Sequence, residues 1–212
     1  MVGLRAVAVV FLVAVTAPAR AEQVQANGPE RFPGPNELTG HLGFASGVSA
    51  YTPSGFTFAA TYGHRMSESG NTSFWFEVGV NAVLGLGDSG CIRDLNGFCS
   101  YTRNNGYTFE PEAGVKLKIT TPIPLVPYFR AAGSFIAVVG RACGDDAIVL
   151  AARAGGGANY YLFRNFAVGL EITTAFGPAF FQGYDASCSD VVRGHTEAFV
   201  ELNFSAGAEL IF

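Results

Sequence analysis

The sequence predicts an all-β protein, an eight-stranded antiparallel barrel with up-and-down topology. Three observations predict it. A two-residue alternation of large apolar with small or polar residues appears in eight stretches from Glu37 onward. Turn residues or longer loops separate these stretches. Only 14% of the residues are charged while 49% are hydrophobic, and a soluble surface usually carries about 25% charge. The barrel is therefore expected to face lipid.

Residues 1–21 are expected to be a secretory signal peptide. Arg5 precedes an apolar run over 6–15, and Ala19-Arg20-Ala21 fits cleavage after Ala21. The run is far shorter than the roughly 20 residues of a membrane-spanning helix. Removal of this leader leaves 11 basic and 17 acidic residues, a balance of −6. This balance argues against a nucleic-acid partner.

The mature chain is expected to begin with an irregular segment over 22–36, followed by the barrel over 37–212. The segment is polar and contains Pro33-Gly34-Pro35. The first three strands are expected near residues 37–50, 56–65 and 74–86, with turns at Thr52-Pro53-Ser54-Gly55 and at 67–71. The third strand has the cleanest pattern, because every second residue from Phe74 to Leu86 is apolar.

Five further strands are expected over 107–119, 126–139, 148–162, 166–176 and 196–212. Pro111 removes a ladder donor from the first of these, so local disruption is expected there. Short turns at 121–124 and 163–165 alternate with long loops at 87–106, 140–146 and 177–194. Short periplasmic turns with longer external loops are typical of bacterial membrane barrels.

The closing stretch, Thr196 to Phe212, keeps its period of two over an unusual length for a soluble strand. It resembles the last strand of outer-membrane β-barrels, which ends in a free aromatic residue. The resemblance implies that this strand is a signal for the barrel-assembly machinery. The residues that would form it are Phe204, Leu210 and Phe212.

Four cysteines in an exported chain predict two disulfides. The sequence leaves three pairings open. Cys91 and Cys99 lie close together and are the favoured local bridge, which would leave Cys143 and Cys188 to join two separate loops. All four would lie at the same end of the barrel. A metal site is disfavoured because no Cys-x-x-Cys or matching His spacing is present.

The face opposite the large apolar residues is expected to fill the lumen. It carries nine charged residues: Glu77, Glu110, Glu112, Lys116, Lys118, Arg130, Arg153, Glu171 and Glu201. Unpaired buried charge is costly, so ion pairing is expected within a lower and a higher layer. Glu110, Glu112, Glu201 and Arg153 form the higher layer. Structural filling is favoured over a proton or ion path, because eight strands leave an interior just filled by side chains.

Catalysis is not expected. The histidines are His41, His64 and His195, and His195 shares a face with Glu197 and has serines in the preceding loop. Such a site could be compared with lipid A deacylases, but the His-x-Ser pattern of that family is absent. No Gly-x-Ser-x-Gly or phosphate-binding loop occurs either. No cofactor is therefore expected.

The whole mature chain resembles the small eight-stranded outer-membrane barrels of the OmpA-transmembrane, OmpX and opacity-protein type. The resemblance implies an integral protein of the bacterial outer membrane, with loops that face the exterior. Outer-membrane lipids and the assembly machinery are the expected partners of a monomer, with the surface ligand left open. A non-enzymatic structural or adhesin-like role is the first hypothesis. Narrow passage of ions or small hydrophobic molecules is the second, and a lipid A-modifying enzyme the third.

Overall fold

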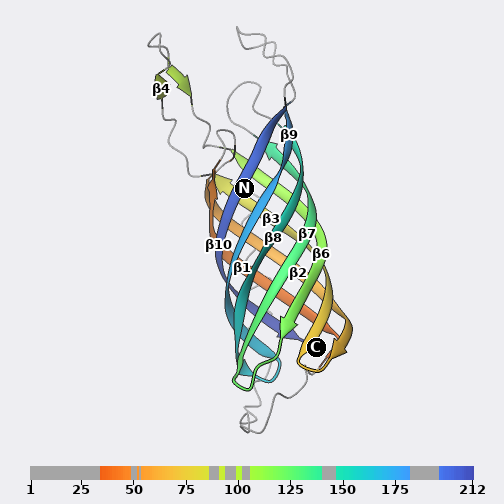
Figure 1. Ribbon diagram of the computed structural model, residues 1–212. Helices are drawn as coiled ribbons and strands as arrows, with labels where there is room; N and C mark the ends of the chain where they lie inside the picture. Colours follow the sequence, from red (N-terminus) through yellow and green to blue (C-terminus); the bar gives the residue numbers. More distant parts are fainter. Residues whose placement is uncertain are drawn as a thin grey trace, which may run out of the picture.

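The computed structural model describes residues 34–48, 52, 54–85, 91–93, 99–101, 106–139, 147–181 and 196–212. Within them, eight strands close into one antiparallel barrel, in the spatial order β1-β10-β9-β8-β7-β6-β3-β2 (Figure 1). The strands are β1 (Asn36–Gly47), β2 (Gly55–Ser69), β3 (Thr72–Gly85), β6 (Tyr107–Ile119), β7 (Leu125–Val139), β8 (Ala147–Phe163), β9 (Phe166–Phe181) and β10 (Thr196–Ile211). Each barrel strand pairs with its neighbours in sequence, which confirms the predicted up-and-down barrel.

Two short strands were not predicted. β4 (Cys91–Arg93) and β5 (Cys99–Tyr101) pair as a separate two-stranded sheet between β3 and β6. The sequence predicted only a loop there. Segments of three residues are too short to show a period of two, so the alternation on which the other strands were predicted gave no signal here.

The chain closes the barrel by pairing its first strand with its last. Leu38 faces Leu210, and Phe44 faces Phe204. At the terminus, Phe212 N donates to Asn36 O over 2.9 Å, and Asn36 N donates to Phe212 O over 3.1 Å. Both chain ends of the barrel therefore meet at the same rim.

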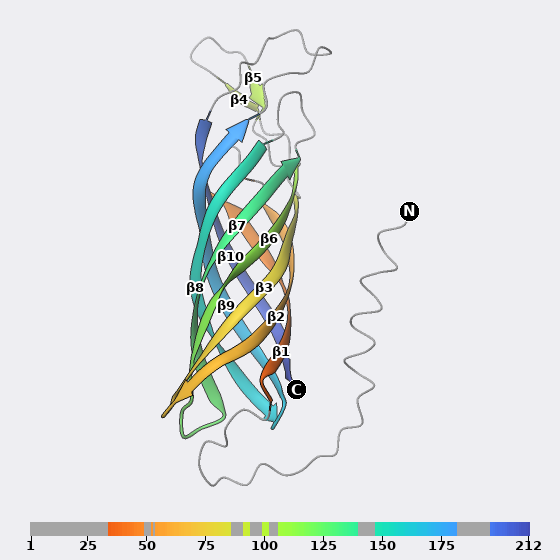
Figure 2. The same ribbon diagram turned by 90° about the vertical axis from the view of Figure 1, so that its right-hand side faces the viewer.

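This rim also carries the three short turns, at 70–71, 120–124 and 164–165 (Figure 2). We call it the turn end, and the opposite rim the loop end. Gly70 has a φ of 57°, in the left-handed region that favours glycine. On the other side of the turn, the Thr72 hydroxyl donates to Ser69 O over 2.9 Å, which tightens the turn.

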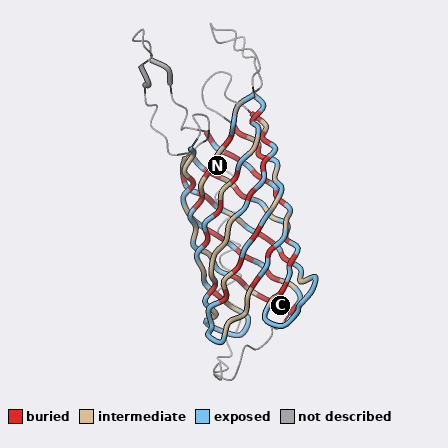
Figure 3. Tube along the Cα trace, in the orientation of Figure 1, coloured by how far each residue is buried: buried red, intermediate tan, exposed pale blue. Residues whose placement is uncertain are grey.

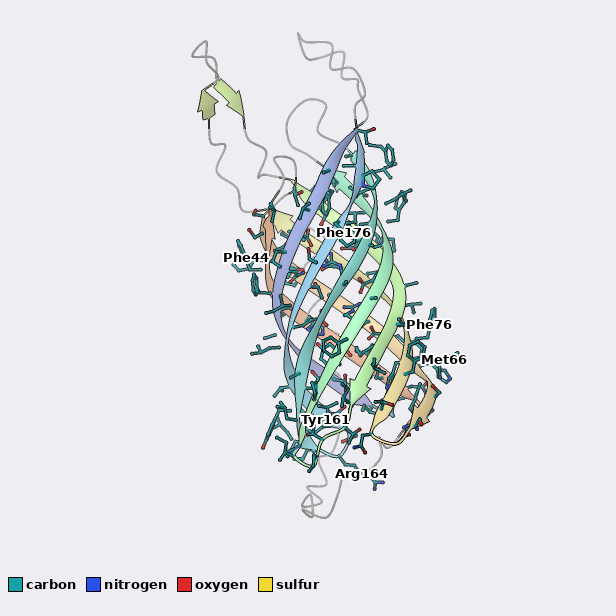
Figure 4. The ribbon with its side chains drawn as sticks, viewed as in Figure 1. Phe44, Met66, Phe76, Tyr161, Arg164 and Phe176 are labelled. Atoms are coloured by element: carbon teal, nitrogen blue, oxygen red, sulfur yellow. The ribbon has the colours of Figure 1, made fainter. Side chains whose placement is uncertain are left out.

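The two faces of every barrel strand differ as predicted. Burial alternates residue by residue along the wall (Figure 3), with charged, polar and small side chains and two apolar clusters inside. Large apolar side chains cover the outside; Phe44, Phe76 and Phe176 are examples (Figure 4). Aromatic residues near strand ends are exposed, among them Phe56, Phe74, Tyr107, Tyr160 and Phe212. Strands of 12 to 17 residues exceed the roughly 9–11 that a tilted membrane strand needs.

Two prolines interrupt the ladders of the wall. The β6–β7 pairing stops at Phe109–Ala137 and resumes at Glu112–Ser134, which confirms the disruption predicted at Pro111. The β8–β9 pairing skips Pro178 in the same way, between Val149–Ala179 and Ala152–Phe176. Proline has no N–H to donate, so each ladder loses a bond at that row.

Candidate functional site: the charged interior of the barrel

The nine predicted lumen charges all lie buried inside the barrel. They come from β3, β6, β7, β8, β9 and β10. Two further carboxylates that the sequence analysis did not include join them, Glu37 on β1 and Glu209 on β10. On their strands, both lie an even number of residues from other lumen-facing residues. The alternation in the sequence could therefore have identified them.

At the turn end, two lysines of β6 are held by three carboxylates. Lys116 Nζ lies 2.7 Å from Glu37 Oε1 and 2.5 Å from Glu77 Oε1. Lys118 Nζ pairs with Glu37 and lies 2.7 Å from Glu209 Oε1. These side chains are at most 3% exposed, so water screens the pairs very little.

Aromatic and amide groups complete the turn-end cluster. Glu209 accepts hydrogen bonds from Tyr161 OH over 2.5 Å and from Asn159 Nδ2 over 2.8 Å. Lys118 Nζ lies 4.8 Å from the centroid of the Trp75 ring, within the range of a cation–π contact. Each buried charge in this cluster thus has more than one partner, which offsets its desolvation.

Arg130 occupies the middle of the lumen. Its Nη1 lies 3.3 Å from Glu171 Oε1, its Nε lies 3.5 Å from Glu77 Oε2, and its Nη2 pairs with Glu112. Glu171 also accepts a 2.9 Å hydrogen bond from Tyr128 OH. One guanidinium therefore serves three carboxylates from three different strands.

Arg153 of β8 forms the next group toward the loop end. Its Nε donates to Glu110 Oε1 over 3.1 Å, and its Nη2 lies 3.0 Å from Glu201 Oε1. Its Nε also lies 3.6 Å from Glu112 Oε2. Because Glu112 is shared with Arg130, the two predicted charge layers are joined rather than separate.

Neutral polar groups continue the network. Asn81 Nδ2 donates to Glu110 Oε2 over 3.0 Å, and Thr57 Oγ1 donates to Asn81 Oδ1 over 2.8 Å. Asn203 Nδ2 then donates to Thr57 Oγ1 over 3.1 Å. The polar interior therefore crosses from β6 through β3 and β2 to β10.

Apolar clusters lie at both ends of this network. Trp75, Val126 and Ile211, with Tyr161 packed against them, form the cluster at the turn end. The cluster toward the loop end contains Ile136, Val138, Ala147, Val149, Ala151, Ala175, Ala179 and Phe199. In the described interior, the smaller apolar cluster therefore lies beside the turn-end ion pairs, and the larger one lies between the Arg153 group and the loop end.

The histidines are placed separately. His41 lies inside, 6% exposed, with Nδ1 3.3 Å from Ser205 Oγ. His64 lies on the outside at the turn end, with Nδ1 3.0 Å from Asn36 Oδ1. His195 lies outside the described residues, so a site formed by His195, Glu197 and a loop serine stays untested.

Of the other predicted site residues, the cysteines lie outside the described part and the assembly-signal residues lie within it. The side chains of Cys91 and Cys99, and the whole of Cys143 and Cys188, lie outside the described part, so the disulfides stay predictions. In the assembly-signal set, Phe204 and Phe212 are exposed on the outer wall and Leu210 is half-buried.

Two features are absent from the described residues. No group of three or more His, Cys, Asp or Glu side chains there is arranged to hold a metal ion. No helix in the same residues is long and apolar enough to cross a membrane.

Comparisons with known proteins show likeness in structure only. No protein-family model matches the chain, and no curated protein sequence matches it. The crystal structure of Neisserial surface protein A matches with a TM-score of 0.55 and 12% identity, over 84% of this chain and 97% of that one.

Two other crystal structures match with lower scores. The outer membrane enzyme PagL matches at 11% identity, over 83% of this chain and 99% of its own, with a TM-score of 0.43. A major outer membrane protein from Thermus thermophilus matches at 14% identity, over 84% and 99%, with a TM-score of 0.42. The closed strand order and the match to Neisserial surface protein A together show that this chain has the fold of a small eight-stranded outer-membrane β-barrel.

Proposed function

We propose that this chain is a non-enzymatic outer-membrane barrel with a structural or surface-interaction, adhesin-like role carried by disulfide-pinned external loops. The observation that carries the proposal is the filled interior. In the described part, ion pairs extend from the turn end through the middle, and apolar clusters fill the space beside and above them. A filled interior stabilises the wall and leaves recognition to the surface beyond it.

The outer wall supports a membrane location. Leu170, Ile172 and Phe204 are 47–69% exposed in the middle of their strands. Exposed apolar surface on this scale is costly in water but is stabilised by lipid. The turn end would face the periplasm and the loop end the exterior, because bacterial barrels have short periplasmic turns.

Heat-modifiable gel mobility of outer-membrane fractions tests this location. The unboiled protein is expected to run as a folded barrel and the boiled protein to shift to its unfolded position. Reductant is expected to change the mobility of the boiled form alone, by opening loop disulfides. Recovery of the protein in the soluble periplasmic fraction would contradict the proposal.

The surface role needs a separate test, in which all four cysteines are replaced by serine. We expect this variant to keep its heat-modifiable shift and to lose adherence of the expressing cells to a panel of host-cell and matrix surfaces. Wild-type cells that adhere no better than cells without the protein would argue against an adhesin-like role.

Passage of ions is the second candidate, and one observation favours it. In the described interior, seven buried glutamates face four buried lysines and arginines, which gives an excess of negative charge. Such an excess would select cations in any open path. Single-channel recording with the purified protein is expected to show no steps. Sustained cation-selective steps would replace the first proposal by this one.

A lipid A-modifying activity is the third candidate. The change His195→Ala is expected to leave the lipid A profile of the expressing host unchanged. A profile that depends on His195 would show that the protein is an enzyme.

A further inference from the structure

Glu209 of β10 connects a lysine of one strand to an asparagine of another. Its Oε1 lies 2.7 Å from Lys118 Nζ of β6, and its Oε2 accepts a 2.8 Å hydrogen bond from Asn159 Nδ2 of β8. This bond fixes the orientation of the amide, because an ionised carboxylate only accepts hydrogen bonds. An amine and a side-chain amide are therefore held on the two oxygens of one carboxylate.

The Asn159 amide is also fixed from the side of β9. Asn159 and Gly169 are partners across β8–β9. A Cβ at position 169 would lie 2.0 Å from Asn159 Oδ1, so the glycine leaves the space that the amide oxygen occupies. Asn159 is only 3% exposed. The amide therefore lies against Gly169 with its nitrogen toward Glu209.

The surroundings of the three groups exclude water. The side chains of Lys118 and Glu209 are at most 1% exposed. The centroid of the Trp75 ring lies 4.8 Å from Lys118 Nζ, and Tyr161 OH donates to Glu209 Oε1 over 2.5 Å (Figure 4). Exclusion of water protects a reaction between amine and amide from competing hydrolysis.

Lys118 also pairs with Glu37, but that carboxylate has a second cation. Lys116 Nζ lies 2.7 Å from Glu37 Oε1. Transfer of a proton from Lys118 to Glu209 turns two buried charges into two neutral groups, which lowers the cost of keeping them from water. Since Glu37 stays paired with Lys116, a neutral amine can form without leaving a carboxylate unpaired.

We propose that Lys118 and Asn159 form an isopeptide bond, and that Glu209 is the group that takes the proton. Glu209 accepts a proton from the Lys118 ammonium, and the neutral Nζ attacks Cγ of Asn159. The new Nζ–Cγ bond forms, a second proton passes from Nζ to Nδ2, and the Cγ–Nδ2 bond breaks to release ammonia. Glu209 keeps the first proton, so the net charge of the cluster does not change.

The reaction needs only a small movement of the lysine. Reacting atoms must approach to about 3–3.5 Å. The flexible four-carbon stem of Lys118 allows its amine to turn from Glu209 Oε1 to the amide carbon, which the same carboxylate holds through Nδ2. Glu209 therefore brings the two groups together as well as taking the proton.

The neighbouring lysine of β6 lacks this arrangement. Lys116 pairs with Glu37 and Glu77. In the described interior, neither of these carboxylates accepts a hydrogen bond from an amide. The bond is therefore specific to Lys118, and Glu77 provides a control position.

An isopeptide bond at this place would tie β6 to β8 across β7. Like a disulfide, it would remain when the barrel unfolds and would restrict the unfolded chain. Unlike a disulfide, it would not be opened by reductant. The barrel would therefore hold a covalent link that does not depend on its cysteines.

Mass spectrometry of protein purified from expressing cells tests the bond. The reduced and unfolded wild type is expected to be lighter than its mature sequence by one ammonia. Protease digestion is expected to give two peptides joined through Lys118 and Asn159. A mass equal to that of the unlinked chain, without joined peptides, would overturn the proposal. Neither result bears on the membrane location.

Two glutamine substitutions test the part played by Glu209. Glu209→Gln removes the proton acceptor and is expected to lose nearly all of the linked form. Glu77→Gln makes the same change beside Lys116 and is expected to keep it. Each variant is first checked for its heat-modifiable shift. Equal amounts of linked protein in the two variants would show that Glu209 does not have this role.

Refolding of the wild type gives a test that needs no variant. Protein taken from inclusion bodies into urea has never folded and is expected to be unlinked. It is expected to gain the link after it folds in detergent micelles, because folding brings the three side chains together. Fully refolded protein that stays unlinked would overturn the proposal.

Discussion

Arg153 shows how the interior handles charge at the scale of a residue. Its guanidinium pairs with Glu110 and Glu201 and lies 3.6 Å from Glu112. In the described interior four cations serve seven carboxylates, so each cation is shared and carboxylates are in excess. Loss of a cation and loss of a carboxylate should therefore have unequal effects.

A pair of substitutions at one ion pair tests this asymmetry. Arg153→Met leaves two carboxylates without their cation and is expected to cost about 3–5 kcal/mol, the usual loss when one partner of a buried pair is removed. Glu201→Gln keeps a hydrogen-bond acceptor beside Arg153 and is expected to change stability by less than about 1 kcal/mol. Urea unfolding in lipid vesicles measures both. Equal losses would show that the shared-cation account is wrong.

At the scale of the element, each strand is a boundary between two environments. β9 places Ile172 outside, 52% exposed, while its neighbours Glu171 and Thr173 are buried inside. On every barrel strand the polar set faces inward and the large apolar set faces outward. A one-residue shift in register would therefore exchange the inward and outward residues. A charged residue placed at an outward-facing position should lower the unfolding free energy, and more so nearer the middle of the bilayer.

Arginine substitutions at two depths test the lipid-facing wall. Ile172→Arg, in the middle of β9, is expected to cost about 2–4 kcal/mol, since a charge at the bilayer midplane loses its hydration. Leu125→Arg, at the turn-end start of β7, is expected to cost at most about 1 kcal/mol. The measurement is unfolding free energy in vesicles. A similar loss of unfolding free energy at both positions would indicate that the outer wall does not span a bilayer.

Glycine has a conformational role in one described turn. Gly70 and Gly133 both have open space where a Cβ would lie, but only Gly70 has a positive φ, 57°. Gly70→Ala is expected to destabilise the barrel by roughly 1 kcal/mol. Gly133→Ala is expected to be neutral or slightly stabilising, because alanine restricts the unfolded chain. Unfolding free energies of the two variants in vesicles provide the comparison.

At the scale of the whole molecule, the chain terminus completes the cylinder. β10 pairs with β1 along its length, and the backbone of Phe212 bonds to Asn36. The side chain of Phe212 is 56% exposed and adds little to the packing of the interior. Its contribution is expected in assembly rather than in the stability of the finished barrel.

Phe212→Ala separates assembly from stability. If Phe212 belongs to the predicted assembly signal, several-fold less protein is expected in the outer membrane of expressing cells. The purified variant is expected to refold in detergent to the same extent as the wild type. The control is Phe44→Ala, which removes an exposed aromatic residue away from the terminus. If both variants reach the membrane equally well, the terminal residue is no signal.

The fold was predictable because a strand that separates two environments repeats a simple constraint. Every second residue faces the same environment. This alternation predicts the inward-facing charges, as it did for Glu77, Arg153 and Glu201. Glu37 has the same parity but stands at the edge of its alternating stretch, where a period of two is hardest to assign. The short strands β4 and β5 gave no periodic signal at three residues each.

The sequence by itself determined the strand number, the two faces of the wall and the set of residues that fills the interior, because these depend only on local alternation. The tertiary structure alone decided which charges meet. Lys118 pairs with Glu209, 91 residues away, because barrel closure places β6 and β10 on opposite walls of one narrow lumen. The ladder interruption at Pro178 likewise depends on the register between β8 and β9, which neither strand encodes alone.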